Sequence, residues 1–263
     1  YDRDYAEMDA MMHKAITIIQ FKVEGQLIKK HPEWNMKERL LLDKIDYKQG
    51  TIKLGDKEYP LNDTYFPTID PKDPYKLTQE EEDVVERLKN SFLGSERLQR
   101  HIRFLYTKGS LYKVYNGNLL YHGCVPLNED GSFMKVRIFD KTYSGKALYD
   151  ILEHYARKGY YSIDPQEKQR GEEILWFIWK NKHSPVFGKE RMATFERYFI
   201  DATETHEEPK NAYYRLFEKE EIVDKITRSI RQTAATGSHF SKMLSPEEEE
   251  IMREIIREFM NAE

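Results

Sequence analysis

The sequence predicts an α/β fold, because helical periodicity and hairpin signals occur together in the 263-residue chain. Apolar residues recur at spacings of three and four in several stretches, which is typical of helices with one buried face. Short strand-like runs flank Gly55-Asp56 and Asn116-Gly117, and both dipeptides suit two-residue hairpin turns. We expect a mixed sheet, or a pair of sheets, flanked by helices, with a helical and hairpin insertion in the first hundred residues.

The first predicted helix, residues 5–30, carries an apolar stripe rich in methionine. His31-Pro32 ends this helix, because the residue before a proline is disfavoured in the α region. We interpret the stripe as core packing rather than as a cofactor site, since methionine fills irregular gaps in a core. Its members share one face: Met8, Met11, Ala15, Ile18, Ile19 and Val23.

Two hairpins and two capped helices follow. The hairpin over 51–61 places Ile52 opposite Tyr59, and the second hairpin lies within 111–127. Between them, residues 62–76 contain three prolines and predict an extended loop. The helices are predicted from their ends: Thr78 and Glu81 have capping-box spacing with Gly94 as the stop, and Ser95 caps a helix that stops near Gly109.

The second half of the chain predicts two more helices, over about 145–158 and 167–180, and then the loop 181–192. Residues 227–242 are small and polar and predict a linker. The stretch from Ser245 begins with a cap, a proline and two acids, which is a favourable helix start. Its apolar face is expected to dock on another surface.

Composition excludes two broad classes of function. Lys plus Arg total 42 and Asp plus Glu total 46, so the net charge of -4 lacks the basic excess of a nucleic-acid binder. No apolar run reaches the roughly 18 residues expected of a membrane span. Cys124 is the single cysteine, so an internal disulfide is impossible and a reducing, cytoplasmic compartment is expected.

The first candidate for chemistry is His122, which ends an apolar strand-like run and precedes Gly123. Ligands of α/β proteins gather beyond the carboxyl ends of strands, and imidazole commonly binds transition metals. A lone histidine at a strand end is also often a hydrogen-bonded structural residue, so both interpretations stay open. We interpret the neighbouring Cys124 as a small buried residue, because no base can be assigned to it.

The second candidate is the basic loop 181–199. Arginine and lysine beside hydroxyls and a glycine suit phosphate recognition, because guanidinium groups bind phosphate through two donors. Glu190 and Glu196 lie in the same loop, so a solvated basic patch explains the residues equally well. His206 is interpreted as a surface residue. The basic candidates of the loop are His183, Lys189, Arg191 and Arg197.

Four long motifs resemble one family of enzymes. The chain over about residues 5–226 is similar to the class III fructose-1,6-bisphosphatases of Firmicutes and related bacteria. The last two motifs are long and unusual, which makes the resemblance specific. The motifs are MMHKAITIIQFKVEGQLIKKHPEWNMKERLLLDKIDY (11–47), GDKEYPLNDTYFPTIDPKDPYKLTQEEE (55–82), NLLYHGCVPLNEDGSF (118–133) and SPVFGKERMATFERYFI (184–200).

The resemblance implies a member of the calcineurin-like metallophosphoesterase superfamily, with part of its sheet core flanked by helices. Such enzymes remove the 1-phosphate of fructose 1,6-bisphosphate in gluconeogenesis. They use a two-metal centre, usually manganese, in which two ions polarise the phosphoryl oxygens and generate a hydroxide nucleophile. The implied division of this chain is a helical region with a hairpin excursion (1–110), the C-terminal part of the core (111–226), and a linker with a C-terminal helix (227–263).

Individual residues carry over only where a motif matches. His122 matches the histidine of the family's HGC motif and is expected to bind metal. Lys189, Arg191 and Arg197 lie in the SPVFGKERMATFERYF motif and are expected to contact the sugar phosphate, with His183 a weaker candidate. The match assigns no catalytic residue in this chain.

The sequence also departs from the family. The superfamily motifs D-x-H, G-D-x-x-D-R and G-N-H-[DE], and a late Gly-His, do not occur in the 263 residues. We therefore expect a piece of the enzyme that carries only part of the site and is inactive alone. The alternative is a non-catalytic remnant, or an oligomerising interaction module, derived from that enzyme. A third possibility is the same chemistry on another phosphate substrate.

Expected partners follow from the same resemblance. Fructose 1,6-bisphosphate is the expected substrate, and manganese the expected cofactor, at a site that is incomplete here. An incomplete sheet leaves an open edge, which invites self-association or pairing with the missing N-terminal half. Neither nucleic acid nor a membrane is expected as a partner.

Overall fold

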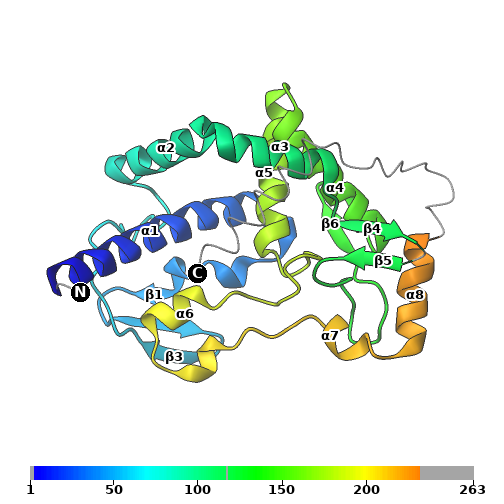
Figure 1. Cartoon of the computed structure of the whole chain (residues 1–263). Helices are drawn as coiled ribbons and strands as arrows, with labels where there is room; N and C mark the ends of the chain where they lie inside the picture. The colour runs from blue at the N-terminus through cyan, green and yellow to red at the C-terminus, as the bar shows by residue number, and fades with distance from the viewer. Residues whose placement is uncertain (1–2, 117, 232–263) are drawn as a thin grey trace. The chain divides into compact units, whose positions relative to one another are not determined.

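The computed structural model describes residues 3–116 and 118–231 (Figure 1). These residues form two compact units, each made of segments that are distant in the sequence. The first unit takes its described residues from 1–87, 137–140 and 189–209, and the second from 88–136, 141–188 and 210–231. The predicted division at residues 110 and 226 stays a prediction.

Helices account for most of the described chain, and the two that begin at Gln79 and at Glu96 start where the capping signals predict. The helices are α1 (Arg3–Lys30), α2 (Gln79–Gly94), α3 (Glu96–Lys108), α4 (Lys146–Tyr161), α5 (Pro165–Lys180), α6 (Thr194–Phe199), α7 (Tyr213–Leu216) and α8 (Glu220–Arg231). Short 3₁₀ helices lie at Pro32–Trp34, Lys37–Arg39, Leu42–Lys44 and Thr203–His206.

The strands are short and form three small sheets. The first sheet has the order β1-β2-β3, and the other two are the pairs β4-β5 and β6-β7. The antiparallel register of β2 with β3 sets Ile52 opposite Tyr59, which confirms the prediction. The strands are β1 (Ile45–Asp46), β2 (Thr51–Leu54), β3 (Lys57–Pro60), β4 (Tyr112–Tyr115), β5 (Asn118–Tyr121), β6 (Val136–Ile138) and β7 (Lys141–Tyr143).

The predicted fold class is therefore confirmed only as a mixture of helices and small antiparallel sheets. The part that the structure describes does not contain the sheet core of a metallophosphoesterase. The physical reason is local pairing, because each short strand bonds to its neighbour in sequence across a tight turn. A parallel core would need long crossover connections between strands.

A buried ion pair joins α1 to the start of α2 in the first unit. Lys22 Nζ donates to Glu81 Oε2 and to the Thr68 carbonyl, each at 2.6 Å. The same Glu81 forms the predicted capping box, since its carboxylate accepts from Thr78 N at 2.8 Å while its own N–H donates to Thr78 Oγ1. Burial of the Glu81 carboxyl opposes ionisation, but these bonds outweigh it and hold its pKa below the usual value.

The methionine stripe of α1 does not pack as predicted. Ile18 and Ile19 are buried, but Met8 and Met11 are exposed, and so is Val23. The core of this unit is built instead from Ile18 with residues of the 41–69 segment and of α6. Since the described elements of the first unit leave the N-terminal half of α1 uncovered, periodicity predicted the helix correctly and its burial wrongly.

In the second unit α4 and α5 pack along each other at a glycine contact. A Cβ added to Gly171 would lie 2.1 Å from the Gly159 nitrogen and 2.4 Å from the Tyr155 carbonyl oxygen. Both helices were predicted, but the close approach of their backbones was not. Gly159 and Gly171 therefore set the distance between the two helices.

The C-terminal region is only partly described. Helix α8 continues to Arg231, so residues 227–231, which we predicted as linker, are helical. The predicted helix from Ser245 lies outside the described residues. None of the helices in the described part is long and apolar enough to cross a membrane.

Replacing Gly171 by alanine should separate α4 from α5. Overpacking of this kind costs about 1–3 kcal/mol, so we expect the free energy of unfolding in urea to fall by that amount. Gly94→Ala is the control, because a Cβ at Gly94 meets nothing within 4 Å. A Gly171→Ala protein as stable as the Gly94→Ala protein would contradict the close packing.

Candidate functional site

In the second unit, two of the sequence motifs meet at Gly123. Its φ of +87° lies in the region that favours glycine, and a Cβ there would lie 2.2 Å from the Pro185 carbonyl oxygen. The next residue, Cys124, donates its N–H to that same carbonyl at 2.7 Å. The glycine of the HGC motif therefore lets the turn after β5 lie directly against the Ser184-Pro185 loop.

Two buried side chains hold this turn in place. Asn211 Oδ1 accepts from Leu127 N at 3.1 Å and from Tyr213 N at 3.0 Å, and Asn211 N donates to the Gly188 carbonyl. The Tyr149 hydroxyl donates to the Cys124 carbonyl at 2.7 Å. Segments around residues 124, 188 and 211 are thus bonded into one rigid group.

His122 lies at the edge of this group, directly after β5, and its side chain is exposed. Because β5 pairs antiparallel with β4 in a two-stranded sheet, His122 does not follow a strand of the larger α/β sheet that was expected. The part of the chain that the structure describes contains no group of three or more His, Cys, Asp or Glu side chains placed to hold a metal. Metal binding by His122 stays a prediction.

Cys124 is fully buried, and burial raises the pKa of its thiol to about 12. It is therefore a neutral thiol at physiological pH and cannot act as a nucleophile there. The interpretation of this cysteine as a small buried residue is confirmed.

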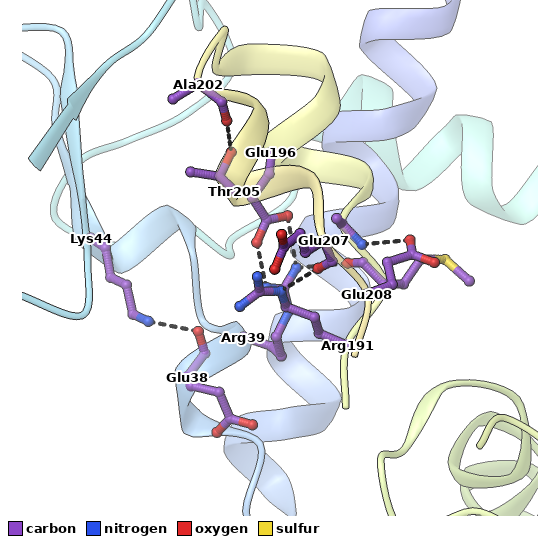
Figure 2. A network of polar contacts seen from close by, with 11 residues as sticks. Glu38, Arg39, Lys44, Arg191, Glu196, Ala202, Thr205, Glu207 and Glu208 are labelled. Atoms are coloured by element: carbon purple, nitrogen blue, oxygen red, sulfur yellow. Dashed lines mark hydrogen bonds and ion pairs between the residues drawn. The ribbon is translucent and has the colours of Figure 1, made fainter. Parts of the chain in front are cut away.

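In the first unit, the basic motif residues belong to a polar network built around two glutamates (Figure 2). The first is Glu196, which accepts two hydrogen bonds from Arg39, at 2.6 and 3.1 Å. Arg39 also donates to the Met192 carbonyl at 2.9 Å. Since Glu196 is almost completely buried, this paired geometry supplies the compensation that a buried carboxylate requires.

The second glutamate, Glu208, lies between two of the predicted substrate-binding residues. Its Oε2 accepts from Lys189 Nζ at 2.6 Å, and its Oε1 accepts from Ala193 N at 3.0 Å and lies 3.7 Å from an Arg197 nitrogen. Burial alone would raise the pKa of this carboxyl, but the bonds from Lys189 and Ala193 outweigh burial and lower it. Glu208 therefore stays ionised and fixes both cations.

The loop 203–208 also supplies backbone acceptors to the same basic residues. Arg191 Nε donates to the Glu207 carbonyl at 2.9 Å, and Arg197 donates to the His206 carbonyl at 3.2 Å (Figure 2 shows the Arg191 contact). The His206 ring is half-buried and contacts the Ile200 carbonyl at 2.8 Å, so it is a structural residue of this loop.

The structure therefore brings together three of the five predicted site residues. Lys189, Arg191 and Arg197 share one network, and the side chains of Lys189 and Arg197 remain 38% and 56% exposed. Both sequence interpretations persist, because these cations are partly neutralised by Glu208 yet still face solvent. His183 and His122 both belong to the second unit. The backbone N–H of His183 donates to Asn181 Oδ1 there.

Comparison with known proteins decides the family. The model of the Firmicute fructose-1,6-bisphosphatases matches residues 1–242. The chain belongs to this family. It is 54% identical over 226 residues to the class 3 fructose-1,6-bisphosphatase of Clostridium tetani and 51% identical over 230 residues to one from Clostridium beijerinckii. These matches cover 86% and 88% of this chain.

The same comparisons show how much of each relative's length this chain matches. It spans about a third of the curated relatives, at 34% of the Clostridium tetani protein and 35% of the Clostridium beijerinckii protein. No solved structure matches the chain.

The residues that organise the basic motif of this family member were not predicted from the sequence. Arg39 lies 157 positions from Glu196, and no local pattern links two residues so far apart. Glu196 did carry a signal, because it lies between the apolar Phe195 and Phe199 on a helix that must bury that face. Glu208 carried no such signal, because its loop contains several glutamates and nothing in the sequence distinguishes one from another.

Gly123→Ala should disrupt the turn that carries His122. The added methyl group would meet the Pro185 carbonyl, and alanine is strained at this positive φ. We expect a loss of about 2 kcal/mol or more in the free energy of unfolding. Gly55→Ala has a similar φ of +61° but open space around it, so the difference between the two variants isolates the close contact.

Glu208→Gln should remove a pH-dependent part of the stability. The folded pKa lies below the ordinary value of 4.5, so ionised Glu208 stabilises the fold above pH 4.5, and this contribution is lost as the pH falls through the folded pKa. We expect wild type to be more stable than Glu208→Gln at pH 7 and the difference to shrink below pH 4.5. Chemical unfolding of both proteins at several pH values measures this difference in the free energy of unfolding.

The control for this experiment is Glu207→Gln. Glu207 contributes its backbone carbonyl to the network, and its exposed side chain lies outside those bonds. Its replacement should leave the stability unchanged at pH 7. A pH-independent loss in Glu208→Gln would show that the charge of Glu208 is not what stabilises the loop.

Proposed function

We propose that this chain is a part of a fructose-1,6-bisphosphatase, which hydrolyses the 1-phosphate of fructose 1,6-bisphosphate to fructose 6-phosphate and phosphate. The observation that carries the proposal is the identity of 54% to a class 3 fructose-1,6-bisphosphatase across most of the chain. The chain carries only part of the active site and is inactive alone, because it spans about a third of such enzymes.

The chain's own residues do not fit a two-metal centre. Two metal ions need several carboxylate and imidazole ligands, and the described residues hold no cluster of three such donors. His122 is the donor that we propose for a manganese site, and its remaining ligands would lie outside the described residues. The described residues therefore do not account for any metal-dependent step of the reaction.

The part of the reaction that we assign to this chain is recognition of the sugar phosphate. Lys189 is half-buried and Arg197 is exposed, both lie against Glu208, and Arg191 is on the same loop. A phosphate group is bound well by cations whose positions are fixed beforehand, because less entropy is lost on binding. His183 is a weaker candidate for the same contact.

The proposal extends to partners and compartment. The chain would act within a larger assembly, either as a homo-oligomer or paired with the missing part of the enzyme. A cytoplasmic location agrees with the single buried thiol. The alternative function is a non-catalytic interaction module, which the exposed apolar residues near the start of α1 would suit.

A segment exchange separates these two functions. The 263-residue chain alone should release no phosphate from fructose 1,6-bisphosphate with added manganese. The Clostridium tetani enzyme should keep at least about a tenth of its activity when its matching third is replaced by this chain. In that chimera His122→Ala should lower kcat by about 100-fold or more, whereas Lys189→Ala and Arg197→Ala should mainly raise KM.

His154→Ala is the matched control, because His154 is an exposed histidine outside the motifs. It should leave turnover of the chimera unchanged. A soluble, folded chimera without activity would favour the interaction module. An active chimera that tolerates His122→Ala would remove His122 from the site but leave the bisphosphatase function standing.

A further inference from the structure

The N-terminal half of α1 exposes a continuous apolar surface. We call it the methionine face, formed by Tyr5, Met8, Met11, Met12 and Ile16. Their exposed fractions run from 40% for Ile16 to 62% for Tyr5. Their spacings of three and four residues place them on one side of the helix. Contiguous apolar surface of this kind marks an interaction site in soluble proteins.

The helix that carries this face is firmly anchored elsewhere along its length. Ile18 belongs to the core, and Lys22 forms the buried pair with Glu81. Gly25 packs directly against the Tyr75 ring, where a Cβ would lie 2.0 Å from ring atoms. Lys14 is held by Asp63 at 2.6 Å. The methionine face is therefore a preformed surface and not a frayed terminus.

The chemistry of the face describes its partner. Methionine side chains are flexible and polarisable, so they adapt to an apolar groove on another protein. The exposed acids Glu7 and Asp9 lie at the margins of the face, which favours a partner groove with basic margins. A second copy of this chain would set acidic margins against acidic margins, which disfavours self-pairing.

We propose that the methionine face of α1 is the docking surface for the part of a class 3 fructose-1,6-bisphosphatase that lies outside this chain. The argument from length is that the matched relatives are about three times as long as the segment they share with this chain. Their additional two thirds supply the protein surface that a preformed apolar helix face requires. This inference rests on the proposed function and identifies the surface through which the two parts of the enzyme meet.

The test is co-purification with a defined partner. A tagged 263-residue chain is co-expressed with the Clostridium tetani enzyme from which the matching third has been deleted. The wild-type chain should retain this partner, and the double variant Met8→Glu/Met12→Glu should retain at least about tenfold less. Glutamate forms helices nearly as well as methionine, so the variant changes the surface and not the helix.

The matched control is Ala6→Glu/Ala10→Glu. It adds the same two charges at the same spacing, on the opposite side of the helix, where both alanines are exposed. It should retain the partner as well as the wild type does. Retention by Met8→Glu/Met12→Glu at the wild-type level, or no retention by the wild type, would overturn the proposal.

Two measurements on the chain alone exclude other occupants. A dimer in light scattering that Met8→Glu/Met12→Glu dissociates would assign the face to a second copy. A melting temperature lowered by Met8→Glu/Met12→Glu but not by the control would show that the chain itself covers the face. Either result would overturn the proposal, which predicts that Met8→Glu/Met12→Glu changes neither the oligomeric state nor the melting temperature of the chain alone.

Turnover of the co-purified pair separates the inference from the proposed function. Retention that depends on the methionine face, without turnover, would support the docking surface and contradict the bisphosphatase activity. Turnover that Met8→Glu/Met12→Glu leaves unchanged would support the bisphosphatase activity and contradict the docking surface.

Discussion

The ion pair between the half-buried Arg39 and the buried Glu196 is the constraint on which the first unit depends. It joins residues 157 positions apart and fixes the segment that carries the basic motif against the N-terminal part of the chain. Removing one partner of such a pair costs about 3–5 kcal/mol, because the other charge is left buried without compensation. The pair and the network around Glu208 meet at the segment before α6, because Arg39 donates to the Met192 carbonyl and the next residue, Ala193, donates its N–H to Glu208. Figure 2 shows Arg39, Glu196 and Glu208 in this network.

This arrangement explains how basic residues can be both structural and available for binding. Glu208 neutralises part of the charge of Lys189 and Arg197 and sets their positions, while most of the Arg197 side chain stays in solvent. In the second unit, backbone geometry positions the candidate residue His122. Gly123 permits a turn that no larger residue allows, and Asn211 and Tyr149 hold that turn beside His122.

Helix caps and hairpin register were predicted well because the hydrogen bonds that determine them join residues close together in the sequence. The Thr78 and Glu81 capping box, the Ser95 cap and the pairing of Ile52 with Tyr59 each involve residues within a few positions of one another. Burial was predicted less well. The periodicity of α1 shows that the methionines share a face, but whether that face is covered depends on which elements pack there, and periodicity holds no such information.

The sequence by itself determined the helices α1 to α5, the β2-β3 and β4-β5 hairpins and, through its long motifs, membership of the fructose-1,6-bisphosphatase family. It also identified Lys189, Arg191 and Arg197 as a group, because they are neighbours along the chain. Only the tertiary structure decided that Glu208 binds two of them and that Arg39 supports their loop. The reason is that a buried charge is paired through space, so its partner is chosen by the fold and cannot be found from spacing along the chain.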